Sequence, residues 1–201
     1  MTTTNETSLL WQLRRLMPRR RLSFAEALRI TELQANRLLE LAHIDEPGVP
    51  SELVTSLPYV QVIFRSDTPN DVSGGTFWLK PRWLVVLSAL DSPARTRFSL
   101  FHEFKHIVDH GATPRLWRED PMALERLAHY FAACVLMPRR LVKRLWGEGV
   151  QQLDELAAIF GVSGQAMRYR LDQLGLAEPR LRCSREVTDS LASPSTHSLA
   201  A

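Results

Sequence analysis

The same helix-start signal occurs twice in the middle of this chain, at Ser92-Pro93 and at Asp120-Pro121. Ser and Asp are favoured at the N-cap of a helix, and proline is favoured at the first helical position because its fixed φ suits the helix. The first signal predicts a helix over residues 93–110 and the second a helix over residues 122–137. The rest of the fold has to pack around these two long helices.

Shorter patterns surround the two helices. Apolar residues recur at helical spacing in two segments before them and three after them, and β-branched and aromatic residues fill three short runs in between. The expected helices are 8–17, 23–43, 140–146, 151–160 and 163–174, and the expected strands are 59–64, 76–79 and 83–87. We therefore expect an α+β fold that is mostly helical, with a small three-stranded sheet packed on the helix 93–110.

Composition is that of a soluble globular protein. The 201 residues are 45% hydrophobic and 23% charged, which are ordinary values for such a chain. No apolar run approaches the roughly 20 residues needed to cross a bilayer, and residues 1–5 are too polar for a signal peptide. We expect a cytoplasmic protein with no membrane contact.

Five arginines, at positions 14, 15, 19, 20 and 21, form the main concentration of charge in a chain of net charge +3. A solvated helix end is the preferred interpretation. An acidic partner or nucleic acid is the alternative.

A metal site is indicated by His102-Glu103-Phe104-Lys105-His106. Residues four apart on a helix share one face, so the imidazoles of His102 and His106 can reach the same metal ion. Glu103 is badly placed as a ligand and well placed as a general base, which is the logic of the HExxH motif. The only cysteines, Cys134 and Cys183, have no CxxC spacing, so His and carboxylate must hold the metal.

A third protein ligand is expected, because a catalytic zinc keeps three ligands and one open position. The next helix carries Glu125 and His129, which are also four residues apart and share a face. We assign Glu125 to the zinc and His129 to the second shell or the substrate cleft. Tyr130, beside His129, is a further candidate for the second shell or the cleft.

Two long segments resemble the ImmA/IrrE metallopeptidases. They are the helix Arg97-Phe98-Ser99-Leu100-Phe101-His102-Glu103-Phe104-Lys105-His106 and the run Glu125-Arg126-Leu127-Ala128-His129-Tyr130-Phe131-Ala132-Ala133-Cys134-Val135-Leu136-Met137-Pro138. Residues 153–174 are similar to the helix-turn-helix-like segment of that family. Positions 101, 104, 105 and 129 depart from the family pattern, with Phe, Phe, Lys and His where Ala, Leu, Gly and Asn are usual. We expect Lys105 to face solvent.

The resemblance implies a bacterial or phage-derived zinc endopeptidase with one Zn²⁺ per chain, held by His102, His106 and Glu125, and with Glu103 as general base. It implies a protein substrate, a helix-turn-helix repressor whose cleavage derepresses stress-response or mobile-element genes. We expect four parts in the chain: N-terminal helices over 1–50, a zincin-like core over 51–138, a helix-turn-helix-like subdomain over 139–182 and a disordered tail over 183–201.

An alternative remains open at this point. Arg168 and Arg170 lie on the second helix of a fair helix-turn-helix pattern. The chain could then be a non-catalytic regulator that binds DNA or a protein partner, such as one half of a toxin–antitoxin-like module, with a degenerate metal site.

Overall fold

The computed structural model describes residues 3–67, 74–112 and 120–176. Its elements in chain order are α1 (Thr3–Arg15), α2 (Phe24–Leu41), α3 (Glu52–Thr55), β1 (Val60–Arg65), β2 (Gly74–Leu79), β3 (Arg82–Ser88), α4 (Pro93–Asp109), α6 (Pro121–Leu136), α7 (Arg139–Gly147), α8 (Leu153–Phe160) and α9 (Gly164–Leu174). The expected fold class, mostly helical with a small three-stranded sheet, is confirmed. The short helix α3 was not expected, and the expected tail lies outside the described residues.

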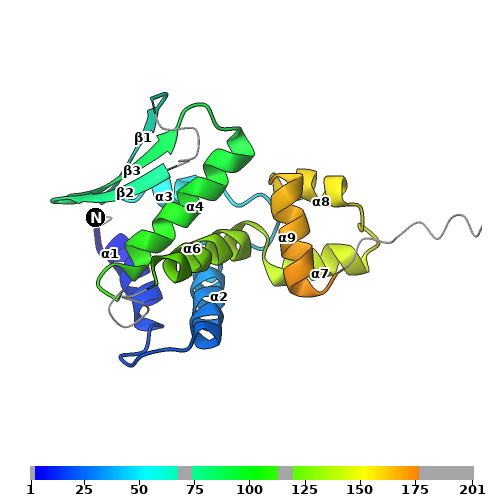
Figure 1. Cartoon of the computed structure of the whole chain (residues 1–201), viewed down its shortest axis with the longest axis horizontal. Coiled ribbons are helices and arrows are strands. Elements are labelled where there is room, and N and C mark those ends of the chain that lie inside the picture. Colours follow the sequence, from blue (N-terminus) through cyan, green and yellow to red (C-terminus); the bar gives the residue numbers. More distant parts are fainter. Residues whose placement is uncertain (1–2, 68–73, 113–119, 177–201) are drawn as a thin grey trace, which may run out of the picture.

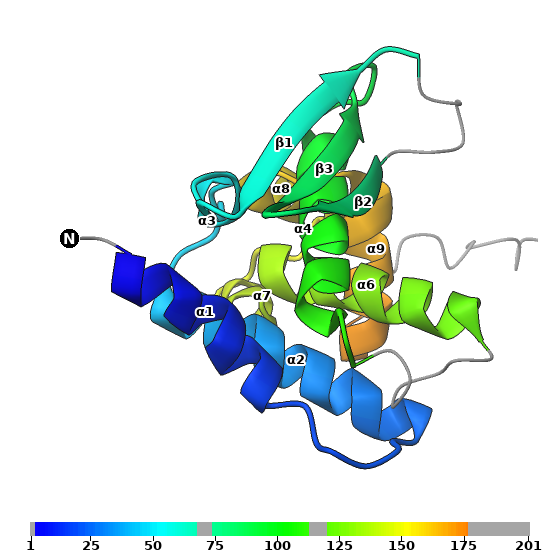
Figure 2. The ribbon, with the colours of Figure 1, turned by 90° about the vertical axis from the view of Figure 1, so that its left-hand side faces the viewer.

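The sheet is mixed, with strand order β1-β3-β2. β1 runs parallel to β3, and β2 runs antiparallel to it. Alternate residues of β3, namely Trp83, Val85 and Leu87, are buried, because successive side chains of a strand point to opposite faces. β2 is an edge strand, and it packs on α4, as Figure 2 shows.

Helix α4 is the centre of the molecule. It packs on α6 on one side and on β2 and β3 on another, while α2 packs on α6 (Figure 1). Nearly every residue from Ser99 to Asp109 is buried, and His106 is the one left partly exposed. Its start follows the sequence signal, since the Ser92 side chain accepts a hydrogen bond from the Arg95 N–H and Pro93 is the first helical residue.

Three helices, α7, α8 and α9, group beside α4 and α6 in the part of Figure 1 away from the sheet. Two arginines connect them to the core. Arg97 of α4 donates to the Phe160 carbonyl at 3.0 Å, and the buried Arg170 of α9 donates to the Met137 carbonyl at 3.0 Å.

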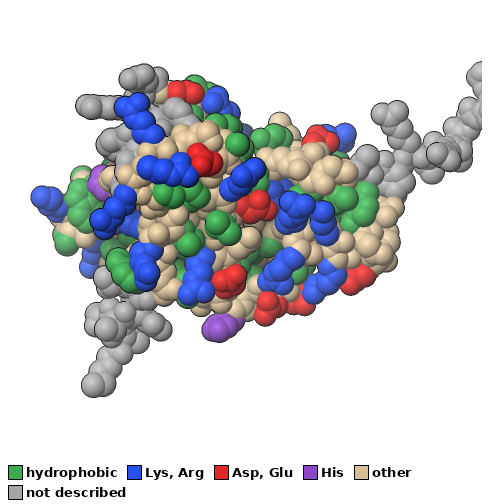
Figure 3. Space-filling model, turned by 90° about the horizontal axis from the view of Figure 1, so that it is seen from below, with side chains coloured by type: hydrophobic (Ala, Val, Ile, Leu, Met, Phe, Trp, Pro, Cys, Tyr) green, Lys and Arg blue, Asp and Glu red, His purple; other side chains and the backbone are tan. Residues whose placement is uncertain are grey.

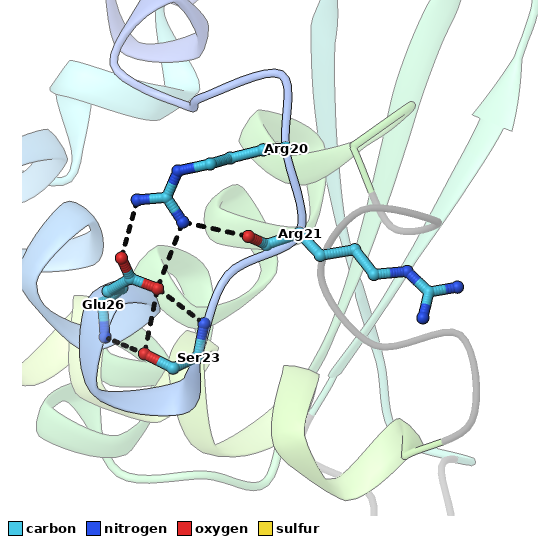
Figure 4. Close-up of polar contacts among 4 residues, drawn as sticks. All are labelled: Arg20, Arg21, Ser23 and Glu26. Atoms are coloured by element: carbon cyan, nitrogen blue, oxygen red, sulfur yellow. Dashed lines mark hydrogen bonds and ion pairs between the residues drawn. The ribbon is translucent and has the colours of Figure 1, made fainter.

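The arginine cluster is partly structural. Arg14 donates to the Ile107 and Val108 carbonyls at 2.7 and 3.2 Å, which satisfies the C-terminal end of α4. Arg20 pairs with Glu26, which also accepts from the Ser23 backbone N–H in a capping box at the start of α2 (Figure 4). Seen from below, Lys and Arg side chains are spread among acidic and hydrophobic ones (Figure 3).

The expectation that Lys105 faces solvent is wrong. Its side chain is 1% exposed, and Nζ donates to Asp109 Oδ1 and to Gln34 Oε1, each at 2.7 Å. The nitrogen also lies 5.8 Å from the centre of the Phe131 ring. Position 105 therefore lies on the side of α4 that α2 and α6 cover.

In the described segments, no helix has the length and apolarity that a membrane span requires.

Candidate metal centre

Three side chains from two helices converge at the middle of α4. His102 Nε2 and His106 Nε2 lie 3.2 Å apart. Glu125 of α6 places Oε2 at 3.1 Å from His102 Nε2 and Oε1 at 3.4 Å from His106 Nε2. The ligand atoms of these three residues all lie within 4.8 Å of one another. The structure thus brings together the three residues expected to hold the metal.

The spacing fits a tetrahedral ion. Ligand atoms at 2.0–2.1 Å from a zinc ion in tetrahedral geometry lie roughly 3.3 Å apart. The two Nε2 atoms lie 3.2 Å apart, and each lies 3.1 or 3.4 Å from a different oxygen of the Glu125 carboxylate. Two imidazoles and one carboxylate form a donor set that suits zinc and leaves a fourth position for water or substrate. The residues therefore fit the cofactor that the resemblance implies.

His102 is held in the neutral form that a metal ligand needs. Burial, together with the neighbouring rings of His106 and His129, lowers the pKa of His102 to about 3. A neutral imidazole has one nitrogen free to bind a metal. The position of His102 inside the packed helix thus prepares it for coordination.

Glu103 is buried beside the three ligands and is held by the sheet. Its Oε2 accepts a hydrogen bond of 2.6 Å from the Thr76 hydroxyl of β2. Burial raises the pKa of Glu103, while the Thr76 hydrogen bond lowers it. None of the described residues donates a hydrogen bond to Oε1, the second oxygen. One oxygen is fixed, and the other remains for a reacting group.

His102 and Glu125 line a cleft of about 1010 Å³. α4 and α6 form the side that carries His102, Glu103 and Glu125. The other side is formed by α9, from Gln165 to Asp172, and Gly74 of β2 lines the cleft as well. The metal centre is therefore accessible to a ligand much larger than water.

His129 borders this cleft, and Tyr130 does not. The His129 ring stands edge-on to the His102 ring at 4.6 Å between centroids, and its Nδ1 lies 3.2 Å from the Glu125 carbonyl oxygen. His129 therefore lies in the cleft, next to His102. Tyr130 points toward α2, where its hydroxyl donates to Glu32 at 3.1 Å.

Residues 58–172 match the model of the peptidase M78 family, described as the IrrE N-terminal-like domain. The chain belongs to this family. The match includes the sheet, both metal-centre helices and α7, α8 and almost all of α9. No curated protein matches the chain.

The fold of this M78 domain is similar to that of a solved structure, a Mycobacterium tuberculosis transcriptional regulator. The TM-score is 0.57 at 17% sequence identity, and the alignment covers 75% of this chain. The chain spans about half the length of that regulator, 52%.

Two residues at the site of the M78 domain, Thr76 and Gly74, were not predicted from the sequence. A Cβ at position 74 would lie 3.3 Å from Glu103 Cγ and 3.1 Å from Leu87 Cδ2, so glycine lets β2 approach α4 closely. The available signal was Gly74-Gly75 inside a strand, which often marks a close approach of the backbone to another group.

Proposed function

We propose that this chain is a zinc-dependent endopeptidase, with His102, His106 and Glu125 as ligands and Glu103 as general base. The observation that carries the proposal is the placement of the Glu103 carboxylate beside three converging ligands in an open cleft. The peptidase family of the chain agrees with this chemistry.

The metal, when bound, supplies a Lewis acid that lowers the pKa of water and polarises a carbonyl group. Glu103 takes the proton of the attacking water on Oε1, and it later delivers that proton to the leaving amine. The Thr76 hydroxyl holds Oε2 during both transfers, so the carboxylate keeps one orientation. Phe101 and Phe104, on the opposite side of α4, are fully buried.

An extended polypeptide suits the surroundings of the centre. β2 is at the edge of the sheet, and edge strands pair with extended peptides through backbone hydrogen bonds. The same strand holds Glu103 through Thr76. A peptide that adds to β2 would therefore pass close to the general base.

The resemblance to the ImmA/IrrE proteins supports a helix-turn-helix repressor as the substrate. Its cleavage would derepress stress-response or mobile-element genes. This part of the proposal rests on the resemblance, and the chemistry above does not depend on it.

The decisive experiment compares Glu103→Gln with Glu125→Ala in the full chain loaded with zinc. We expect Glu103→Gln to keep one zinc per chain and to lose cleavage of the repressor that neighbours its gene, by at least about a hundredfold if general-base catalysis contributes its usual share. Glu125→Ala should lose both zinc and cleavage. Zinc is measured by elemental analysis and cleavage by mass spectrometry.

Two results would contradict the proposal. Cleavage by Glu103→Gln at the wild-type rate would remove the general-base role. A wild-type protein that binds duplex DNA in a salt-sensitive way, yet holds no zinc and cleaves nothing, would instead favour a non-catalytic regulator.

A further inference from the structure

We propose that the exposed face of α9 is the specificity-determining wall of the metal cleft, where Arg168 binds an acidic side chain of the polypeptide substrate and Tyr169 binds an apolar one. This inference rests on the proposed peptidase function and adds a substrate preference to it. The relevant residues are Gln165, Arg168, Tyr169 and Asp172, which we call the α9 stripe.

The α9 stripe is one face of a helix. Its members are spaced by three, one and three residues, which places them together along one side. All four are exposed, and all four line the cleft that contains His102 and Glu125. The opposite face of α9 is buried through Met167, Arg170 and Leu171. The side of α9 that is free to bind another molecule therefore borders the metal ligands.

The position of the stripe relative to the metal ligands is fixed by two hydrogen bonds from different elements. Arg97, five residues before His102, holds the end of α8 at the Phe160 carbonyl. Arg170 holds α9 itself at the Met137 carbonyl, and its side chain is 1% exposed. Preorganised walls of this kind lose little entropy when a ligand binds.

Arg168 is the cleft cation that is available to a substrate. Arg95 pairs with Asp91, and Arg126 pairs with Asp120. Within residues 3–67, 74–112 and 120–176, no carboxylate pairs with Arg168. An arginine that can present its planar fork to a carboxylate gives both attraction and geometric selection. An acidic side chain of the substrate would supply the partner that Arg168 lacks among the described residues.

Tyr169 offers the apolar part of the same wall. It is 56% exposed, although its neighbours Met167 and Leu171 are buried. Exposed tyrosines contribute a large and rigid contact area at low entropic cost, which makes them frequent in binding sites for proteins.

The position of the α9 stripe favours peptide binding over DNA recognition. A helix-turn-helix protein inserts the exposed face of its second helix into the major groove. Here the same face shares a cleft with His102, Glu103 and Glu125, so a duplex would have to enter the metal cleft. An extended peptide is the better match for that space.

The test uses the full-length Glu103→Gln protein loaded with zinc, so that peptides bind without turnover, and a phage-displayed library of random peptides. We expect enrichment of peptides that combine Asp or Glu with an apolar residue. Adding Arg168→Glu should weaken the acidic peptides by about tenfold, the size of a reversed charge pair that is partly exposed, and should shift the preference toward Lys and Arg. Adding Tyr169→Ala should remove the apolar preference alone.

The matched controls are substitutions of the same kind at positions outside the cleft. Arg139→Glu alters an exposed arginine of α7, and Phe64→Ala removes an exposed aromatic side chain of β1. Neither position lines the cleft, so both should keep the parental peptide profile and melting temperature.

No enrichment at all, or an unchanged acidic preference in Arg168→Glu, would overturn the inference. It would also be overturned if Arg168→Glu abolished binding to duplex DNA and left the peptide profile intact. None of these results depends on cleavage, so the proposed peptidase function stands or fails separately on the Glu103→Gln comparison with wild type.

Discussion

A buried lysine lies one residue before His106. Lys105 is surrounded by Asp109, Gln34 and the Phe131 ring, and burial lowers its pKa while Asp109 acts in the opposite direction. A paired charge in the interior gives little net stability, but removing one partner leaves the other uncompensated. The pair therefore holds α4 and α2 in one arrangement through Gln34.

Replacing Asp109 by Asn should destabilise the fold by about 3 kcal/mol, because the Lys105 charge then lacks its counter-ion in the interior. The double variant Lys105→Met/Asp109→Asn should recover most of this loss. Urea unfolding at neutral pH measures both.

The exposed pair Arg37–Glu40, with side chains 42% and 64% exposed, provides the control. Glu40→Gln should change stability by no more than about 0.5 kcal/mol. A similarly small effect of Asp109→Asn would show that Lys105 does not need its partner.

Thr76 is expected to position Glu103 rather than to bind substrate. Thr76→Val removes the hydrogen bond to Oε2 at nearly constant volume, and we expect kcat to fall by about tenfold, the value of one hydrogen bond to a charged group. Zinc content and KM should stay close to wild type, and Thr76→Ser should restore kcat. A loss that appears in KM alone would place Thr76 in substrate binding.

At the scale of elements, the capping box at the start of α2 includes the Glu26 carboxylate. The contribution of this charge to stability can be tested by varying the pH. The hydrogen bond from Arg20, followed by those from the Ser23 backbone and hydroxyl, lowers the pKa of Glu26 from 4.5 to about 2. A pKa that is lower in the folded state stabilises the fold above the unfolded pKa, and this contribution disappears as the pH falls through the folded pKa.

Glu26→Gln should therefore lower the unfolding midpoint above pH 4.5, and the difference from wild type should shrink as the pH falls from 4.5 toward 2. Thermal unfolding over this range, at equal ionic strength, gives the comparison. If the difference between wild type and Glu26→Gln grows as the pH falls, the folded protein destabilises the ionised form of Glu26.

Local signals were sufficient for every described element except α3 and for half of the site. Caps at Ser92 and Asp120 predicted the starts of two helices, because an N-cap is a property of a few adjacent residues. The spacing of His102 and His106 likewise predicted a shared face. The burial of Lys105 was missed, since spacing tells which residues share a face and not which helix covers it.

Contacts between distant segments were harder to predict. Thr76 meets Glu103 across 27 positions of the sequence, and nothing in a single strand specifies which helix it will contact. The place of the C-terminal helices depends on Arg97 and Arg170, whose partners are backbone carbonyls. Every residue has a backbone carbonyl, so residue types do not indicate which carbonyl an arginine will bind.

At the scale of the whole molecule, two glycines test how α8 and α9 are attached to the core. Gly161 and Gly175 both end helices in the left-handed region, at φ of 61° and 66°. A Cβ at Gly161 would lie 2.7 Å from Arg97 Nη1, whereas a Cβ at Gly175 would meet no atom within 4 Å.

Gly175→Ala should cost about 1 kcal/mol, the strain of a left-handed alanine. Gly161→Ala should cost about 2 kcal/mol, because it also displaces Arg97 from the Phe160 carbonyl and loses that hydrogen bond. Hydrogen exchange should rise over α8 and α9 in Gly161→Ala only. Equal stability and equal exchange in the two variants would show that Arg97 does not hold the C-terminal helices.

The two faces of α9 are under different constraints, and this has an evolutionary consequence. Substitutions on its buried face disturb the core, whereas positions 165, 168, 169 and 172 can change without altering any buried packing. If the proposed function holds, a lineage can keep the cluster of His102, His106 and Glu125 and acquire new targets by altering four surface codons. We expect relatives with the same metal helix to differ most at these positions when their target proteins differ.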